Sequence, residues 1–578
     1  PFLTFAWMAL TPPDNAGEDW KNKVSANLMT KALRGEALDF LVMLKEQADV
    51  SDAKNLKTKE ARGNYVFEKL KRNAATYQKN IIALLEAENA TYQSFKIINA
   101  LHVKGDFSLL KKIAQLPEVL QLSDNSPVQL EEVKEETPQT NERGPTSIEW
   151  GIDMIDAELV WAMGINGQGV IVGGQDTGYD WTHPALSQKY RGNQGVAPDH
   201  NYNWHDAIHE INAGNTGTNP CGLDSPFPCD DNSHGTHTMG TMVGEDGDNQ
   251  IGVAPGAKWI ACRNMERGDG TPATYIECFE WFMAPTDLNN ENPDVSKSPH
   301  VINNSWHCPV EEGCDASNWD MMNLVIQNLK ASGVVVVFSA GNTPGCETIT
   351  NPAMFEASFT IGATASNDSI AGFSSRGSVT VDGSDLMKPN VSAPGVNVRS
   401  CFPDSSYATI SGTSMAAPHT TGMVALLISA NPDLAGHVEI IEDIIEQTAV
   451  PKTDTMDCGG ISSQQVPNNI YGYGRINALA AVNAALAWTS TDDNNLEKIS
   501  VDVFPNPTDG LVSFEIKNLQ GSTRIDIFDV AGHLILSRDW NLQEFQIKTL
   551  DLTVFASGIY FYKIKNEEVE MTGKILKK

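Results

Sequence analysis

The sequence predicts an α/β core, a parallel sheet flanked by helices, which lies between a small α+β domain and a C-terminal β-sandwich. Across residues 148–488, apolar strand-like runs alternate with helical stretches. Residues 499–578 instead show short alternating runs separated by Gly, Asn and Pro. A chain of 578 residues is also too long for one ordinary core. We therefore expect three domains, the first of them spanning residues 1–130.

The central region carries the clearest strand signals. VIVGG begins at Val170, VVVVF at Val334 and FTIGA at Phe359. Continuous apolar runs of this kind are typical of strands that are buried on both faces of a parallel sheet.

The first domain reads in the order strand, helix, strand, helix, strand. The first strand is expected at Phe40–Leu44, and FKIINALHV from Phe95 reads as one extended run. The first helix is expected to carry five apolar residues on one face: Val66, Leu70, Tyr77, Ile81 and Leu85.

Two polar segments read as exposed linkers, residues 131–147 and residues 489–498. Both should be accessible to proteases. The short apolar run at residues 1–12 fits either the remnant of a signal peptide or a buried segment, because the basic region that would decide is absent.

The charge of the chain excludes one class of partner. Acidic residues outnumber basic ones by 73 to 41, which gives a net charge of −32. Such a surface repels polyanions, so we expect no nucleic-acid partner. No apolar run of about 18 residues occurs, so we expect no transmembrane segment.

All nine cysteines lie between residues 221 and 458, which predicts disulfides in the middle domain of a protein from an oxidising compartment. The sequence leaves the connectivity open, and one cysteine must stay unpaired. The short-range candidates are Cys221 with Cys229, Cys262 with Cys278, and Cys308 with Cys314.

Asp176 follows the buried run VIVGG, which places it at the carboxyl end of a parallel strand, where open α/β proteins carry their sites. Its Asp-Thr-Gly triplet also occurs in aspartic proteases. That mechanism needs a second carboxylate to share a proton, and the chain has no second triplet of this kind. A plain turn is the other alternative.

His234 and His237 are spaced so that a helix could place both imidazoles near one face. A zinc site would need a third ligand, and the chain has no His-Glu-x-x-His motif. We interpret His237 as a structural histidine and His234 as a candidate base.

Ser414 lies in GTSMAAP, directly before an apolar helix. A helix N-terminus offers backbone N–H groups and a dipole that favour developing negative charge beside a nucleophile. A simple N-cap would explain one Ser or Thr but not the whole run. Asn342 ends SAGN after another strand, where its amide could donate to an oxyanion, although Asn beside Gly is often only a turn.

Four motifs, QDTGYDWTHPAL, HGTHTMGTMVG, SAGN and GTSMAAPH, follow one another in this order. Together with VINNSW, KPNVSAPG and YGYGRINA they resemble the subtilisin family, in particular its bacillopeptidase F-like branch. The resemblance implies a serine endopeptidase that acts on proteins and peptides through an acyl-enzyme. It implies that Ser414 is the nucleophile, His234 the base and Asp176 the orienting acid, with Asn342 and the Ser414 N–H as the oxyanion hole.

The flanking domains carry weaker resemblances. Residues 1–130 resemble subtilisin propeptides in size and position, which implies a zymogen whose own propeptide inhibits it, and an activation region at 131–147. Residues 499–578, with VFPNPTDGLVSFEI and ASGIYFYKIK, resemble the sorting domain of type IX secretion. This implies export through the periplasm of a Gram-negative bacterium, with the type IX machinery as a partner.

The chain departs from the family pattern near the cleft, where Trp306 and His307 follow Ser305 and His307 takes the place of a glycine. This puts substrate specificity in doubt but not catalysis. We expect no cofactor for catalysis. Ala185 stands where the family's strong calcium site uses Asp, so that site is not expected, whereas acidic loops with Asp246 and Asp248 leave weaker structural calcium open.

A competing hypothesis is a secreted, non-catalytic binding or adhesion protein on a subtilisin scaffold. The four candidate catalytic residues argue against it, because such groups act as one unit and a scaffold without activity would not need all of them.

Overall fold

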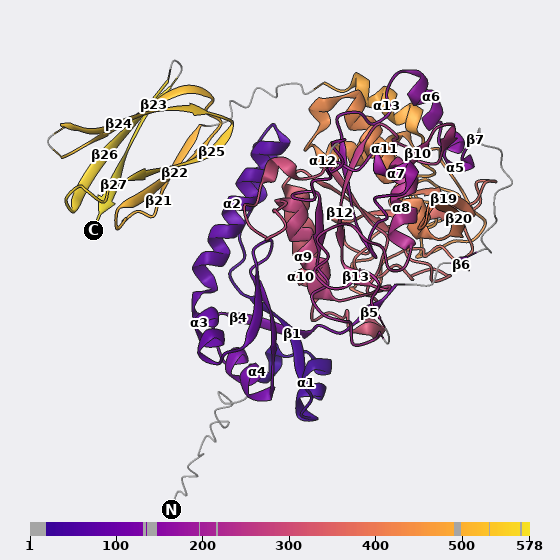
Figure 1. The fold of residues 1–578 in the computed structure, drawn as a ribbon, viewed down its shortest axis with the longest axis horizontal. Coiled ribbons are helices and arrows are strands. Elements are labelled where there is room, and N and C mark those ends of the chain that lie inside the picture. Colours follow the sequence, from indigo (N-terminus) through magenta and orange to yellow (C-terminus); the bar gives the residue numbers. More distant parts are fainter. Residues whose placement is uncertain are drawn as a thin grey trace, which may run out of the picture.

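The structure is a computed structural model that describes residues 19–130, 134–135, 147–195, 197–215, 218–489, 499–530, 532–566 and 569–578. It has the predicted fold class, an α/β core with a smaller α+β unit on one side and a β-sandwich beyond it (Figure 1). Residues 1–12 and most of the two expected linkers, 131–147 and 489–498, lie outside the described residues.

The core is built on seven parallel strands in the order β18-β17-β16-β15-β8-β12-β9. The carboxyl ends of its central strands meet at one edge, which is where side chains from distant parts of the sequence can converge. The strands are β8 (Ile171–Asp176), β9 (Trp204–Asp206), β12 (Lys258–Arg263), β15 (Val301–Asn304), β16 (Val335–Ser339), β17 (Phe359–Thr364) and β18 (Val391–Pro394).

Helices cover both faces of this sheet. Along β16, Val337 packs with the cluster that includes α8 and α11, whereas Val336 packs with α9 and α10. Because successive side chains point to opposite faces, a strand covered on both sides must be apolar throughout. The helices of the core are α5 (Trp150–Met154), α6 (Ala157–Ala162), α7 (Pro184–Ser187), α8 (His234–Val243), α9 (Pro272–Met283), α10 (Trp319–Ala331), α11 (Thr413–Ala430), α12 (Val438–Thr448) and α13 (Ala478–Ala487).

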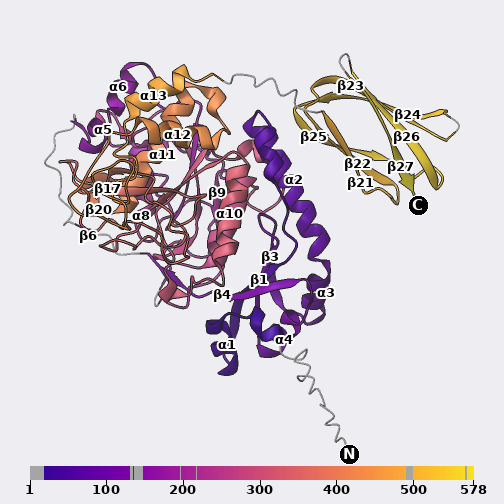
Figure 2. The same cartoon turned by 180° about the vertical axis from the view of Figure 1, so that it is seen from behind.

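The N-terminal unit has an antiparallel sheet in the order β2-β3-β1-β4, with helices packed on it. It lies along α9 and α10 of the core, and the two units share one apolar cluster (Figure 2). Its elements are α1 (Ala26–Leu33), β1 (Leu38–Leu44), α2 (Lys59–Tyr77), α3 (Lys79–Ala87), β2 (Thr91–Phe95), β3 (Ala100–Gly105), α4 (Phe107–Ala114) and β4 (Val119–Asp124).

The predicted element order of this unit was wrong in two places. The helix expected through Leu85 is two helices, because buried Gln78 ends α2, begins α3 and donates to the carbonyl oxygen of Phe95 at 2.9 Å. The run from Phe95 is two strands joined by a turn. Glu280 of the core accepts from the backbone N–H of Ile97 at 2.9 Å, so this turn is fixed by a partner distant in sequence.

The C-terminal unit is the predicted β-sandwich. One sheet has the order β21-β22-β25, the other β24-β23-β26-β27, and their inner faces form a separate apolar core. The strands are β21 (Ser500–Phe504), β22 (Leu511–Lys517), β23 (Gly521–Phe528), β24 (Leu534–Leu542), β25 (Phe545–Asp551), β26 (Gly558–Lys565) and β27 (Glu570–Lys577).

Short strands form three small sheets beside the large one, and in two of them β5 and β6, which follow the N-terminal unit, pair with strands of the core. They are β5 (Val128–Gln129), β6 (Lys134–Glu135), β7 (Ser147–Ile148), β10 (Glu245–Asp246), β11 (Asn249–Gln250), β13 (Met265–Glu266), β14 (Asp269–Gly270), β19 (Val398–Phe402) and β20 (Ser406–Ser411).

The three short-range disulfides are present, and a fourth, Cys346–Cys458, closes a separation of 112 residues. Within the described ranges, buried Cys401 is the cysteine left without a disulfide. Among the helices of the same ranges, none combines the length and apolarity that a membrane span requires.

Candidate active site

Asp176 and His234 are in direct contact. Asp176 is the last residue of β8, and His234 is the first residue of α8. The Nδ1 atom of His234 lies 2.8 Å from Oδ1 and 3.0 Å from Oδ2 of Asp176, and both side chains are buried. A carboxylate can only accept, so Nδ1 carries the proton and Nε2 keeps its lone pair when the ring is neutral.

The charge of Asp176 decides the protonation of His234. Burial lowers the pKa of the imidazole, but the negative charge and hydrogen bond of Asp176, together with the charge of Asp230, outweigh burial and raise it above its ordinary value. The imidazole therefore keeps its second proton up to a higher pH than it would at a buried position without these charges.

Ser414 is the second residue of α11, which packs along α8. Its hydroxyl donates to the backbone carbonyl oxygen of Ser305 at 3.3 Å, and the Ser305 hydroxyl donates to the carbonyl oxygen of Ser414 at 2.9 Å. Nε2 of His234 is buried and has no hydrogen-bond partner in the described part of the chain. The Ser414 hydroxyl thus bonds to Ser305, the residue after β15, and not to His234.

Asn342 joins the same corner through the residue before Ser414. Its Oδ1 accepts from the backbone N–H of Thr413 at 2.8 Å and from the Thr413 hydroxyl at 2.9 Å. These two bonds assign the carboxamide oxygen to Thr413, which directs the amide NH₂ to the opposite side. The structure thus brings all four predicted site residues to one edge of the sheet.

Beyond the N-terminal unit, the chain pairs with two segments of the core. In β5, Val128 pairs with Gly270, and the N–H of Leu130 donates to the carbonyl oxygen of Gly268 at 2.7 Å. In β6, Lys134 pairs with Ser411, three residues before Ser414. Residues 131–133, which the structure does not describe, separate these two pairings.

Comparison with known proteins identifies the family of the chain. The sequence profile of the subtilase family matches residues 167–474, more than half of the chain. The chain belongs to the subtilase family.

This subtilase is similar in sequence to several named proteins. It is 37% identical over 504 residues to bacillopeptidase F of Bacillus subtilis (strain 168), a match covering 81% of this chain and 33% of that protein. It is 30% identical over 337 residues to subtilisin Savinase of Lederbergia lenta, covering 58% of this chain and 98% of that protein. Subtilisin E of Bacillus subtilis (strain 168) is 28% identical over 377 residues. The chain spans about a third of the length of bacillopeptidase F.

The C-terminal unit of this subtilase matches a secretion system C-terminal sorting domain over residues 502–578. This match confirms the interpretation of the tail as a sorting domain. The domain indicates a secreted or cell-surface protein.

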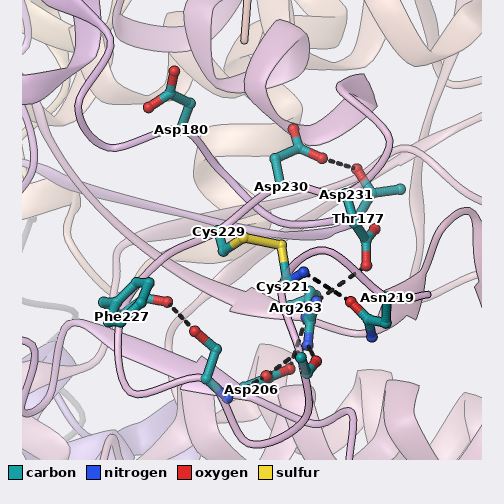
Figure 3. Close-up of a disulfide and its surroundings, with 12 residues drawn as sticks. Thr177, Asp180, Asp206, Asn219, Cys221, Phe227, Cys229, Asp230, Asp231 and Arg263 are labelled. Atoms are coloured by element: carbon teal, nitrogen blue, oxygen red, sulfur yellow. Dashed lines mark hydrogen bonds and ion pairs between the residues drawn. A yellow bond between two sulfur atoms is a disulfide. The ribbon is translucent and has the colours of Figure 1, made fainter. Parts of the chain in front are cut away.

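Asp230 is a site residue that the motif analysis missed. Its carboxylate accepts from the backbone N–H groups of Ser233 and Thr236, at 2.8 and 2.9 Å, so it caps the helix that begins with His234. It also accepts from the Thr177 hydroxyl at 2.9 Å, which ties the end of β8 to the same cap (Figure 3). An Asp shortly before a helix is a capping signal, and this signal could have been read from the sequence.

The Cys221–Cys229 disulfide lies beside this cap (Figure 3). The carbonyl oxygen of Cys229 accepts from the N–H of Tyr179 at 3.2 Å. Below it, buried Arg263 bonds to Asp206 and to Asp231, with N–O distances of 2.7 to 3.0 Å. The guanidinium thus anchors both ends of the loop that carries the disulfide, and a charge this deeply buried is stabilised by such paired contacts.

The other residues singled out in the sequence have structural contacts. The Nε2 atom of His237 lies 3.1 Å from the carbonyl oxygen of Val398, and burial lowers the pKa of this ring to about 3, as expected for a structural histidine. Trp306 is buried, and its ring stacks on Tyr275 at a centroid distance of 4.0 Å. The effect of His307 on specificity stays a prediction.

The sequence leaves open whether acidic loops bind structural calcium. In the ranges that the structure describes, no three His, Cys, Asp or Glu side chains are grouped to hold a metal ion. Asp246 lies on β10, where its carboxylate accepts from the Tyr407 hydroxyl at 3.4 Å. Calcium at Asp246 or Asp248 stays a prediction.

Proposed function

We propose that this subtilase is a secreted serine endopeptidase, made as a zymogen, which cuts proteins and peptides through an acyl-enzyme on Ser414. The observation that carries the proposal is the buried contact between His234 Nδ1 and the Asp176 carboxylate. This contact fixes the tautomer in which Nε2 can take a proton.

In the proposed reaction, rotation of the Ser414 side chain replaces its bond to Ser305 by one to Nε2 of His234. The hydroxyl attacks the peptide carbonyl while His234 takes its proton, and Asp176 stabilises the resulting imidazolium. The Asn342 amide and the Ser414 N–H donate to the oxyanion. His234 then gives the proton to the leaving amine. In the second half of the reaction, a water molecule attacks the carbonyl of the acyl-enzyme while His234 takes its proton, and His234 returns that proton to the Ser414 oxygen as the acid product leaves. No step requires a cofactor.

Residues 1–130 are the proposed propeptide and intramolecular inhibitor. Support comes from their contact with the core, where the Asn328 amide donates to the carbonyl oxygen of Ile97 at 2.7 Å and the Gln93 amide to Glu277 at 2.8 Å. Further support comes from the pairing of Val128, near the end of this unit, with Gly270 of the core. A segment bound there competes with substrate.

The domain limits are proposed as expected from the sequence: a linker and activation region at 131–147, a catalytic domain at 148–488, a linker at 489–498 and a sorting domain at 499–578. Because Leu130 bonds to Gly268 and Lys134 pairs with Ser411, three residues before Ser414, we place the first, autocatalytic cut between Leu130 and Lys134. A secretion-linked peptidase makes the second cut at 489–498, after the type IX machinery has exported the chain from the periplasm of a Gram-negative cell.

The test is to incubate the purified protein with a fluorophosphonate probe and with casein, beside the Ser414→Ala variant. Labelling and hydrolysis that both depend on Ser414 support the endopeptidase. A folded wild-type protein that does neither supports the non-catalytic binding protein instead.

Processing is tested separately by mass spectrometry of the secreted protein and by deletion of residues 500–578. The deletion should give a fully active enzyme that stays in the periplasm. Intact termini on the mature protein, or a core inactive without the tail, would refute the processing scheme.

A further inference from the structure

The C-terminal unit packs against α2 of the N-terminal unit (Figures 1 and 2). At the centre of this contact, the ring of Phe545 meets Tyr65 edge to face, with centroids 5.2 Å apart. Phe545 is 2% exposed and Tyr65 is fully buried. Buried aromatic pairs in this geometry contribute attraction beyond the area they remove from water.

Glu544, the residue before Phe545, binds the start of α2. Its carboxylate accepts from the backbone N–H of Lys57 and from that of Thr58, the latter at 3.1 Å. The first N–H groups of a helix have no partner within the helix, and the positive end of its dipole favours a carboxylate. The C-terminal unit therefore binds the backbone N–H of Thr58, the N-cap residue of α2, and that of Lys57 before it.

Opposite charges match along the rest of the contact. Arg72 on α2 pairs with Glu515, and its guanidinium lies 4.0 Å from the centre of the Phe504 ring. Lys517 lies 3.6 Å from Asp52, with its ammonium 4.4 Å from the Tyr65 ring centre. A contact without a role would not be expected to pair a cation of each unit with an anion of the other.

The opposite side of the same helix is bound to the catalytic unit. Lys59 donates to the carbonyl oxygen of Ser298 at 3.1 Å, and Arg62 donates to that of Gly436 at 2.5 Å. A side chain at Gly63 would collide with Val295, so the helix lies as close to the core as its backbone allows. Helix α2 is thus held between the catalytic and the C-terminal units.

We propose that the C-terminal unit is a brace for the propeptide, which helps to retain residues 1–130 on the enzyme after the first cut. This rests on the proposed zymogen function. Once the chain is cut between Leu130 and Lys134, the propeptide is held by non-covalent contacts alone. The C-terminal unit stays tethered to the catalytic unit, so its contacts with α2 act at high effective concentration. Removal of the sorting domain then couples arrival outside the cell to release of the inhibitor.

The test uses the full chain with Phe545→Ala, and Phe561→Ala as the matched control, because Phe561 is 45% exposed on the other sheet of the sandwich. The co-eluting propeptide is measured by size-exclusion chromatography, and its release by the lag before casein hydrolysis. We expect Phe545→Ala to shorten the lag about tenfold, as loss of one buried aromatic pair allows. Phe561→Ala should behave as wild type. Equal lags for wild type and Phe545→Ala would overturn the brace.

A charge exchange controls for misfolding. Arg72→Glu and Glu515→Arg should each speed release, and the double variant should restore retention of the propeptide. If the double variant releases as fast as the single ones, the pairing of these side chains does not hold the two units together.

A second measurement is independent of proteolysis. In the Ser414→Ala chain, hydrogen exchange at the Lys57 and Thr58 amides should become faster with Glu544→Ala and stay unchanged with Glu570→Ala. Unchanged exchange with Glu544→Ala would overturn the contact. Failure of the proposed function would instead appear as a wild-type chain that does not cut casein, whatever these amides show.

Discussion

The hydroxyl of Ser414 donates to the backbone carbonyl oxygen of Ser305 at 3.3 Å, while the Ser305 hydroxyl donates back to the carbonyl oxygen of Ser414. The start of α11 is thereby fixed to the residue that follows β15. The hydroxyl of the proposed nucleophile is therefore bonded to Ser305, whereas Nε2 of His234 has no hydrogen-bond partner among the described residues.

Replacement of Ser414 by Ala should abolish casein hydrolysis and leave the chain uncut, because the bond-forming oxygen is lost. Removal of this serine in a subtilisin lowers turnover by about 10⁶-fold, a value borrowed from that relative. SDS gels of the expressed protein and a casein assay check both effects. Ser384→Ala, in an exposed loop, is the control. Self-processing by the alanine variant would show that Ser414 is not the nucleophile.

Asn342→Ala should lower kcat by about 10²–10³, the range measured for the equivalent amide in a subtilisin, while KM changes little. The reason is that an oxyanion donor acts mainly in the transition state. Steady-state kinetics on a peptide substrate separate the two constants. A raised KM with unchanged kcat would assign Asn342 to substrate binding instead.

The pH dependence of the activity should follow the titration of His234. Activity needs the neutral ring, so it falls as the pH drops through the pKa of His234, and the raised pKa places this loss at higher pH than for an ordinary histidine. Asp176→Asn removes the carboxylate charge, so burial dominates and the acid limb of kcat/KM should move to lower pH.

The same variant should reduce the plateau rate by about 10⁴-fold, as in other serine proteases. Asp382→Asn, on an exposed loop, should leave both the limb and the plateau unchanged. An acid limb that does not move in Asp176→Asn would mean that another group controls the profile.

The disulfides should differ in their contribution to stability. Cys346 and Cys458 are 112 residues apart, whereas Cys308 and Cys314 are six apart. A cross-link over a longer loop removes more entropy from the unfolded chain, by roughly 4.7 kcal/mol for 100 residues. Replacing both Cys346 and Cys458 by Ala should therefore lower Tm more than the same change at Cys308 and Cys314. Calorimetry that ranks the pairs in the reverse order would contradict this entropic account.

EDTA should leave kcat on a short peptide unchanged, because no metal takes part in the proposed steps. If acidic loops such as that of Asp246 bind calcium, chelation should appear as a lower Tm. Parallel kinetic and thermal measurements check this. Lost turnover in protein that is still folded would show that a metal acts in the chemical step.

The sequence by itself determined the fold class of the core and the candidate site residues. Asp176, His234 and Ser414 were singled out by local motifs at the end of a strand or the start of a helix, and their proposed roles come from the resemblance of those motifs to the subtilisin family. Strands such as VVVVF were read from their local apolar pattern. The short-range disulfides were also accessible, since cysteines close in sequence are restricted in where they can meet.

Only the tertiary structure decided the features that depend on distant partners. Gln78 splits a helix because it reaches Phe95, and the turn after Phe95 exists because Glu280 binds its backbone. The same holds for the Cys346–Cys458 disulfide and for the Phe545–Tyr65 contact between the two ends of the chain. No periodicity or spacing encodes such pairs, because the free energy that selects them comes from groups that meet only after folding.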